Sequence, residues 1–367
     1  MKKLLKAVII LPIFVIGMFL VKMGQQDKTT YQIEKWDNVY NENSIQFYYE
    51  KLSEPRLKII NSTYKIDEFL SEEQSEIDKV KKAAEILNNI VKYNSAAKDT
   101  EAFNGYDILS LKGDDNKASQ RDMAIILRDI LYSAGIYARV GEFRSEKEFF
   151  IKEQNYHVIE YWSVENEKWI MYDFIEMGYF TDKNIPCSGV ELAVKGLNNL
   201  EFIGIDSSSR YTKSKGRIFT TYSIMIDNTM DMKTSNTYIE YFNKKNKINL
   251  EYKNNFLPPI IYTKSTELFE AAPKAKAILS DKRAYIIIMK ADGENDKFIV
   301  GAFQNSRVIR NYFISINNSD YYRVNTYESI EFTPGNNSIS VSLDGEEETA
   351  RIEVKYTPDN TEKIEKE

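Results

Sequence analysis

His157 is the only histidine of the chain, and an aromatic residue and a carboxylate follow it at spacings that suit acyl-transfer chemistry. Trp169 stands 12 residues after His157, and Asp173 stands 16 residues after it. Two paired strands with a tight turn would give this spacing, so we expect His157 and Asp173 to face each other across a hairpin. In acyl transfer the imidazole is the base for a nucleophile and the carboxylate orients the imidazole. The alternative is a structural histidine whose ring N–H the carboxylate satisfies.

The nucleophile of such a site would stand at the start of a helix, where the dipole lowers the pKa of a thiol. Near the start of one predicted helix stands Gln120, whose amide is not nucleophilic. Ser119 precedes it and is a candidate substitute, although an N-cap is its simpler role. Cys187, the only cysteine, lies beyond these elements, and we do not expect it to be the nucleophile.

A helix from about Ser119 to Ala134 is predicted to position the nucleophile. Ser119 and Asp122 resemble a capping box, and apolar residues recur at helical spacing up to Gly135, which ends the helix. Three strands are predicted after this helix, at Ile136–Phe143, Tyr156–Val164 and Trp169–Ile175. His157 falls on the second of them and Asp173 on the third.

Other elements are predicted around this group. Ser71 is expected to cap an earlier helix whose apolar face runs from Ile77 to Val91. Short alternation predicts a strand in Lys58–Phe69, and Ser188–Leu197 has the pattern of a short helix. A loop is predicted at Asn104–Asp115. Asp206–Gly216, which is rich in Ser and Lys, is predicted to be either a long loop or the edge of the domain.

The pattern changes near Thr234. Short β-rich runs separated by Gly, Asn and Asp turns continue to Tyr356, which predicts a β-sandwich of roughly a hundred residues. The last residues, 357–367, are charged and predicted to be disordered.

The N-terminus has the features of a targeting segment. Lysines at positions 2, 3 and 6 precede an apolar run from Ala7 to Val21, with no small-residue cleavage site and no cysteine after it. We favour an uncleaved signal anchor over a cleaved signal or a buried core helix. The lysines should stay in the cytoplasm, so the rest of the chain would be exported.

Composition narrows the choice of partner. Of the 367 residues, 43% are hydrophobic and 28% charged, which is typical of a globular chain, and the net charge is −6 without a basic stripe. Nucleic acid is therefore not an expected partner. One cysteine allows no intrachain disulfide, and we find no pattern for a metal or a cofactor.

The middle of the chain resembles a transglutaminase-like domain of the papain-like fold. The resemblance covers about Ser71 to Tyr179, and the motif residues that carry it are Asp122, Ala124, Gly135, Ile136, Ala138, Arg139, His157, Trp169 and Asp173. It implies that His157 and Asp173 hold triad positions and that Gln120 stands where the family has its cysteine. Ile159 where an aromatic is common, and Phe174 where the family has proline, are further departures.

Together these features predict an α+β chain in five parts. They are a signal anchor (1–26), a stalk or loosely packed lead-in (27–55), the transglutaminase-like domain (56–230), a β-rich domain (234–356) and the tail (357–367).

Three functions remain open. We favour a membrane-anchored, extracytoplasmic, non-catalytic protein that acts in binding or assembly at the cell envelope, with cell-wall peptide, glycan or an envelope protein as partner. The alternative is a hydrolase or acyltransferase on cell-wall peptide or amide that uses His157 and Asp173 with Ser119 or water. The third is a structural stalk whose β-sandwich makes the functional contacts.

Overall fold

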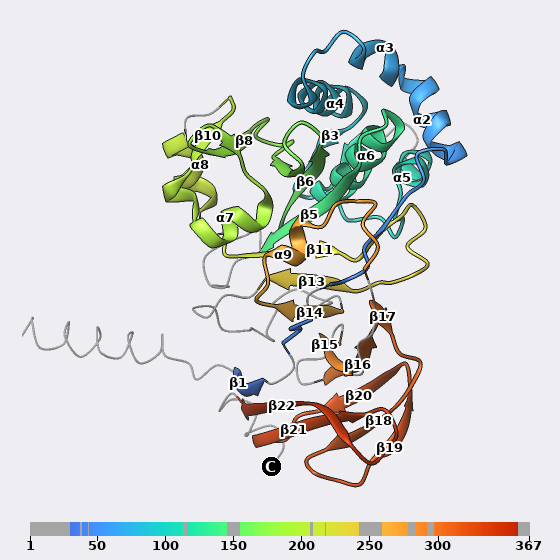
Figure 1. Cartoon of the computed structure of the whole chain (residues 1–367), viewed down its shortest axis with the longest axis vertical. Helices are drawn as coiled ribbons and strands as arrows, with labels where there is room; N and C mark the ends of the chain where they lie inside the picture. The colour runs from blue at the N-terminus through green and yellow to red at the C-terminus, as the bar shows by residue number, and fades with distance from the viewer. Residues whose placement is uncertain are drawn as a thin grey trace, which may run out of the picture.

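The computed structural model describes residues 30–36, 39–42, 44–112, 116–144, 155–205, 208–216, 218–241, 259–277, 283–291 and 297–358. Within them the chain is a mixed α+β structure with more strand than helix (Figure 1). The expected anchor (1–26) and most of the expected tail lie outside the described residues. Among the helices of the described part, none has the length and apolar character needed to cross a bilayer.

A six-stranded sheet forms the centre of the upper part of the molecule in Figure 1. Neighbouring strands are antiparallel except β13 and β14, which are parallel. In spatial order the strands are β14 (Ile260–Thr263), β13 (Tyr238–Tyr241), β11 (Thr221–Met225), β5 (Ala138–Arg144), β6 (Asn155–Ser163) and β7 (Lys168–Tyr172).

Helices cover one face of this sheet. The central one is α6 (Gln120–Ser133), which begins at the N-cap Ser119 and ends before Gly135, whose φ of 80° suits glycine. The apolar residues of α6 pack with Ile159 and Tyr161 of β6 in one core cluster. Around it lie α2 (Pro55–Tyr64), α3 (Ile66–Leu70), α4 (Glu76–Ile90), α5 (Gly105–Lys112) and the short strands β3 (Lys92–Tyr93) and β4 (Lys117–Ala118).

The opposite face of the sheet packs on a second core. Tyr156, Val158 and Met171 point to this side, away from α6. The elements around this core are β2 (Tyr48–Tyr49), β8 (Tyr179–Asp182), β9 (Ile185–Pro186), α7 (Gly189–Lys195), η1 (Leu197–Asn199), β10 (Glu201–Ile203), α8 (Ser208–Lys215), β12 (Asp227–Asn228) and α9 (Glu267–Glu270). Strand β6 thus sends alternate side chains into two different cores.

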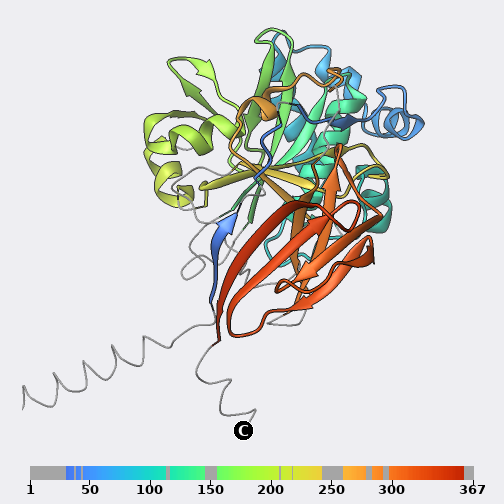
Figure 2. The same ribbon diagram turned by 60° about the horizontal axis from the view of Figure 1, so that its bottom comes forward.

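The C-terminal part consists of two antiparallel sheets that share a third apolar core (Figure 2). The first is ordered β1 (Thr30–Trp36), β22 (Glu348–Thr357), β21 (Gly335–Ser342), β18 (Asn311–Ile316) and β19 (Tyr322–Asn325). The second contains β15 (Tyr285–Lys290), β16 (Lys297–Gln304), β17 (Arg307–Val308) and β20 (Tyr327–Glu331).

The segment expected to be a loosely packed lead-in is well packed where it is described. Strand β1 pairs with β22 at the far end of the chain, and Tyr31 stacks on Tyr356 with ring centroids 4.8 Å apart. Tyr40 is only 2% exposed. Strand β1 pairs with a strand more than three hundred residues away in the sequence, so no local pattern could have indicated β1.

Three local predictions were wrong. Lys58–Phe69 is helical rather than extended, with Pro55 in the first turn of α2, where its missing N–H costs nothing. Asn104–Asp115 contains helix α5, because the Asn104 side chain accepts a hydrogen bond from the Asp107 amide at 2.8 Å and caps the helix. Asp206–Gly216 contains α8.

One boundary also moved. The cap of α4 is Ser75, not Ser71, and its hydroxyl accepts a hydrogen bond from the Asp78 amide at 3.2 Å. The short helix expected in Ser188–Leu197 is confirmed as α7, and the strands β5, β6 and β7 are confirmed with ends shifted by one to three residues.

Candidate functional site

The start of α6 holds the position where the resemblance places a nucleophile. Gln120 occupies it and is 8% exposed. Its side-chain Nε2 donates a hydrogen bond of 2.9 Å to the backbone carbonyl of His157 on β6. The glutamine thus ties the helix start to the histidine strand, and it offers the site a polar amide where acyl transfer needs a nucleophile.

Ser119 is used as a helix cap. Its Oγ accepts a hydrogen bond from the Asp122 amide at 3.1 Å, and the residue is 6% exposed. Its backbone is extended, as an N-cap requires. This geometry matches the simpler of the two roles that the sequence allowed.

Removing this cap should cost stability. We expect Ser119→Ala to lower the free energy of unfolding by about 1 kcal/mol, because one amide of the first turn loses its acceptor. Ser119→Asp should retain most of the wild-type value, since aspartate also caps helices and its charge suits a helix N-terminus. Denaturant unfolding of the three proteins measures this. An aspartate variant as unstable as the alanine variant would contradict the capping role.

His157 is half-buried on the face of the sheet that carries α6. Its direct cross-strand partner on β5 is Glu142. Burial lowers the pKa of His157 below its usual value, and the neighbouring Glu142 and Asp99 carboxylates oppose that shift. The carboxylate that most favours the charged form of His157 in this structure is therefore a glutamate that the sequence analysis did not single out.

Asp173 is fully buried, and its carboxylate has other partners. Oδ2 accepts hydrogen bonds from the hydroxyls of Tyr156 at 2.8 Å and Tyr211 at 2.6 Å. Oδ1 accepts from the amides of Ile175 at 2.9 Å and Glu176 at 3.0 Å. Burial raises the pKa of Asp173, and these hydrogen bonds oppose the shift.

The structure does not bring His157 and Asp173 together. Ile159 pairs with Tyr172 across the hairpin, so continuing this register sets Asp173 opposite Val158 and not opposite His157. Side chains alternate along a strand, so a shift of one residue sends them to opposite faces. Val158 and Tyr156 lie in the core away from α6, and that is the side on which Asp173 is bound. The expectation that the two residues face each other is wrong for this reason.

A row of polar side chains crosses the sheet beside His157. Direct strand pairing places His157, Glu142, Ser223 and Glu240 side by side on β6, β5, β11 and β13. Arg144 binds both oxygens of Glu142, at 3.0 and 2.8 Å, and reaches Glu240 at 3.4 Å. The three charged residues are each at most 4% exposed. Burial alone would raise the pKa of Glu142, but Arg144 and His157 outweigh it and hold that pKa below its usual range.

Trp169 and Arg139, two residues that carry the family resemblance, stabilise the packing of the core. The Arg139 guanidinium lies over the Trp169 ring, 4.1 Å from its centroid, and its Nε is 2.7 Å from Glu160 Oε2. Arg139 also donates to the carbonyl of Phe269, and Glu160 accepts from the amide of Gly189. Arg139 and Glu160 have fully buried side chains, so this ion pair joins the sheet to α7 and α9 from within the core.

Cys187 and Asp122 have structural surroundings. The Cys187 thiol is fully buried, and burial raises its pKa to about 11, so it is neutral and unsuited to nucleophilic attack. Asp122 is fully buried at the first turn of α6 and accepts hydrogen bonds from the amide and hydroxyl of Thr100. It fixes the loop that precedes α5 against the helix.

The sequence analysis missed Glu142, Arg144 and Glu240. The signal for Glu142 was present in the predicted strand Ile136–Phe143, and Arg144 directly follows that strand. Residues two apart on an extended chain share one face. Their position beside His157 depends on the register between β5 and β6, and Glu240 depends on the pairing of β13, neither of which local pattern gives. Among the described residues, no group of three His, Cys, Asp or Glu is arranged to hold a metal ion.

Comparison with known proteins adds little to this geometry. No family model matches the chain, and no curated protein matches it. Among solved structures, it is similar to a crystal structure of a protein described as a "putative protease" from Parabacteroides distasonis, with 10% sequence identity and a TM-score of 0.23. That match covers 83% of this chain and 53% of the other, so the chain spans about half the length of this relative. A TM-score this low supports no inference about fold or activity.

Proposed function

We propose that this protein is a non-catalytic binding or assembly protein built on a transglutaminase-like fold. One observation carries the proposal: Gln120, at the position where the resemblance places a nucleophile, donates a hydrogen bond of 2.9 Å to the His157 carbonyl. By the resemblance, the start of α6 and strands β6 and β7 are the elements that would carry an acyl-transfer triad. The nucleophile is absent, and Asp173 is bound to two tyrosines on the other face of the sheet.

The proposal includes a location and a class of partner. The lysine-flanked apolar run at the N-terminus favours a membrane-anchored chain with its bulk outside the cytoplasm. There the surface around Gln120 and His157 would bind cell-wall peptide, glycan or an envelope protein. The exposed Asp99 and the partly exposed Arg121 flank His157 and would contribute charge to that contact.

Hydrolysis or acyl transfer is the competing function. It would need Ser119 or a water as nucleophile and His157 as base. Ser119 is engaged as the cap of α6, and the imidazole lacks the aspartate that would orient it. These two observations favour binding over catalysis.

Turnover by the full-length protein separates the two functions. We expect wild type to release no more product than a protein-free blank from peptide amide substrates and from amine-incorporation assays, because no activated nucleophile is present. His157→Ala and Gln120→Ala should give the same blank rate. Turnover by wild type that either substitution abolishes would overturn the proposal.

Binding is tested by site-specific crosslinking. A photoreactive amino acid at position 99, beside His157, should give a discrete adduct in the cells that produce the protein. The same group at position 72, an exposed residue just before α4, is the matched control and should give none. Equal adducts at both positions, or none at position 99, would count against a binding surface near His157.

A further inference from the structure

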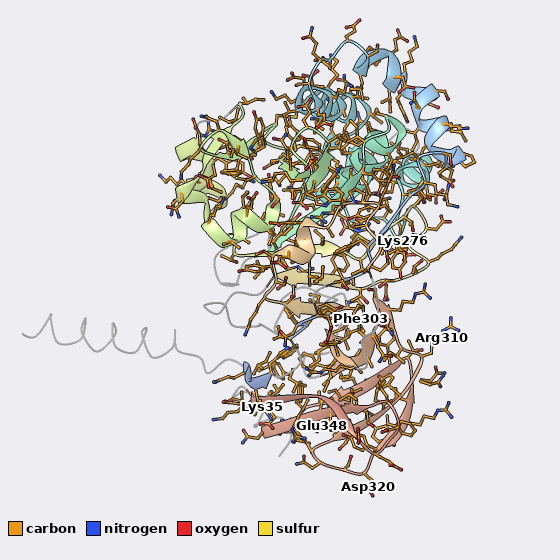
Figure 3. All side chains as sticks on the ribbon, in the orientation of Figure 1. Lys35, Lys276, Phe303, Arg310, Asp320 and Glu348 are labelled. Carbon is orange, nitrogen blue, oxygen red and sulfur yellow. The ribbon has the colours of Figure 1, made fainter. Side chains whose placement is uncertain are left out.

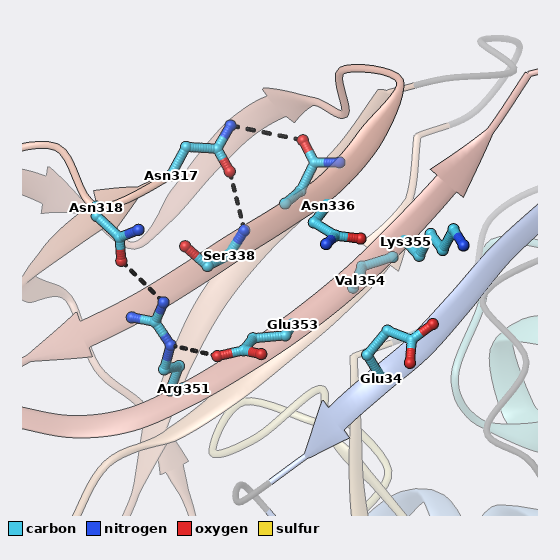
Figure 4. A pocket seen from close by; sticks show the side chains of 10 residues that line it. Glu34, Asn317, Asn318, Asn336, Ser338, Arg351, Glu353, Val354 and Lys355 are labelled. Atoms are coloured by element: carbon cyan, nitrogen blue, oxygen red, sulfur yellow. Dashed lines mark hydrogen bonds and ion pairs between the residues drawn. The ribbon is translucent and has the colours of Figure 1, made fainter.

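A groove lies on the outer face of the C-terminal five-stranded sheet (Figure 4), and His157 is not among its lining residues. Its volume is about 610 Å³. Strands β21 and β22 and the turn after β18 supply most of its walls, and Glu34 of β1 completes them.

The hollow follows from side-chain size on neighbouring strands. Ser338 on β21 pairs with Glu353 on β22, and a short side chain therefore lies beside a long one. Arg351 on the same face of β22 extends toward Asn318 (Figure 4). Glu348 also lies in this C-terminal part of the molecule (Figure 3). The Glu348 carboxylate accepts a hydrogen bond from the Ser340 hydroxyl.

The groove has a fixed polar wall. Arg351 donates to Glu353 at 3.0 Å and to Asn318 Oδ1 at 2.8 Å. Asn317 Oδ1 accepts from the Ser338 amide at 2.9 Å, and Asn337 is 3% exposed and bonded to Thr333. A ligand would therefore meet groups that are already held in place, which lowers the entropic cost of binding.

Formal charges in the groove cancel. Glu34 and Glu353 carry two negative charges, and Arg351 and Lys355 carry two positive ones. A strongly charged ligand would find no net attraction here. Val354 is the only apolar residue of the lining, and its side chain is 1% exposed and belongs to the core. An apolar ligand or an apolar peptide side chain would therefore find little surface to bury.

The groove offers a ligand both hydrogen-bond donors and hydrogen-bond acceptors. The Asn336 carboxamide is exposed, and the Asn318 amide nitrogen remains for a ligand when its oxygen is bound by Arg351. Carboxamides donate and accept, carboxylates accept, and ammonium groups donate. A sugar hydroxyl also donates and accepts, so adjacent hydroxyls can use a donor and an acceptor on the same wall.

We propose that this groove binds a neutral, hydroxyl-rich oligosaccharide. The site is separate from the surface around His157, so either assignment can fail without the other. The groove would give the protein a contact with glycan through its C-terminal five-stranded sheet. The contact proposed around His157 would lie on the six-stranded sheet.

Calorimetric titration of the full-length protein tests the proposal, in a detergent without a sugar headgroup. The probes are cellotetraose, maltotetraose and a tetramer of N-acetylglucosamine. At least one should bind, with an affinity that changes less than about twofold between low and high salt, because a neutral ligand is not screened. The absence of binding by all three at millimolar concentration would overturn the proposal. Tighter, salt-sensitive binding of a sulfated oligosaccharide would also overturn it.

Variants locate the binding. Asn318→Ala and Asn336→Ala should each weaken the affinity about tenfold, the loss of roughly one good hydrogen bond. The matched control is Asn325→Ala on β19 of the same sheet, an exposed asparagine outside the groove, which should bind like wild type. Thermal unfolding verifies that all three fold. Wild-type affinity in both groove variants would show that the groove does not bind the sugar.

Discussion

Replacing Arg139 with methionine should lower the free energy of unfolding by about 3–5 kcal/mol, the usual cost of leaving one member of a buried ion pair alone. Methionine fills much of the same volume, but it leaves the Glu160 carboxylate buried without the guanidinium that balances its charge. The stacking of the guanidinium on Trp169 and its bond to Phe269 are lost as well. Urea unfolding measures the change.

Two further variants define this effect. Arg323→Met, at an exposed arginine of β19, should change stability by no more than about 0.5 kcal/mol. Arg139→Met combined with Glu160→Gln should recover part of the loss, because the buried charge is gone. A single Arg139→Met variant as stable as wild type would mean that the ion pair is not buried as described.

Replacing Asp173 with alanine should be the second large effect, a loss of about 3 kcal/mol or more. Four donors lose their acceptor at once: two tyrosine hydroxyls and two backbone amides. An unsatisfied buried donor costs about 1–3 kcal/mol, and the costs do not simply add. Asp173→Asn should be milder, since one oxygen remains to accept. Chemical unfolding of both variants provides the measurement.

The same variants show whether Asp173 acts with His157. His157→Ala should cost at most about 1 kcal/mol, because the residue is half-buried and no hydrogen bond of its imidazole is found among the described residues. In a double-mutant cycle the two alanine substitutions should add within about 0.5 kcal/mol. A coupling energy above about 1 kcal/mol would indicate a working His–Asp pair.

Local sequence pattern was sufficient for the helix that carries the site. Ser119, Asp122 and Gly135 mark the ends of α6 through contacts within a few residues, and the apolar stripe sets its buried face. The hairpin of β6 and β7 was predictable for the same reason, since a polar turn separates two alternating runs. The presence of His157 and Asp173 on adjacent strands is a local property.

The chemistry of His157 and Asp173 depends on contacts between segments that are distant in the sequence. A one-residue difference in register sets Asp173 against Tyr156 and Tyr211 instead of His157, and Tyr211 comes from α8, which was expected to be a loop. The charge partner of His157 comes from β5, across a connection whose length does not fix the pairing. The sheet in the C-terminal part is completed by a strand from the other end of the chain.

Two contacts hold the surface around His157 in a fixed shape. The Gln120 amide maintains the link between the helix start and the histidine strand. Glu142, held by both of its oxygens to Arg144, maintains a fixed charge next to the imidazole. Such a site keeps its shape without an oriented base, which is compatible with recognition of a ligand.

The most direct measurement is an NMR titration of the His157 imidazole, whose signals are unambiguous because the chain has one histidine. The pKa of wild type should lie below the usual value of about 6.5. Glu142→Gln should lower it further, since Glu142 is the neighbour that most favours the charged ring, and Asp173→Asn should leave it unchanged. A pKa that falls in Asp173→Asn and stays at the wild-type value in Glu142→Gln would contradict the account and restore the His157–Asp173 pair.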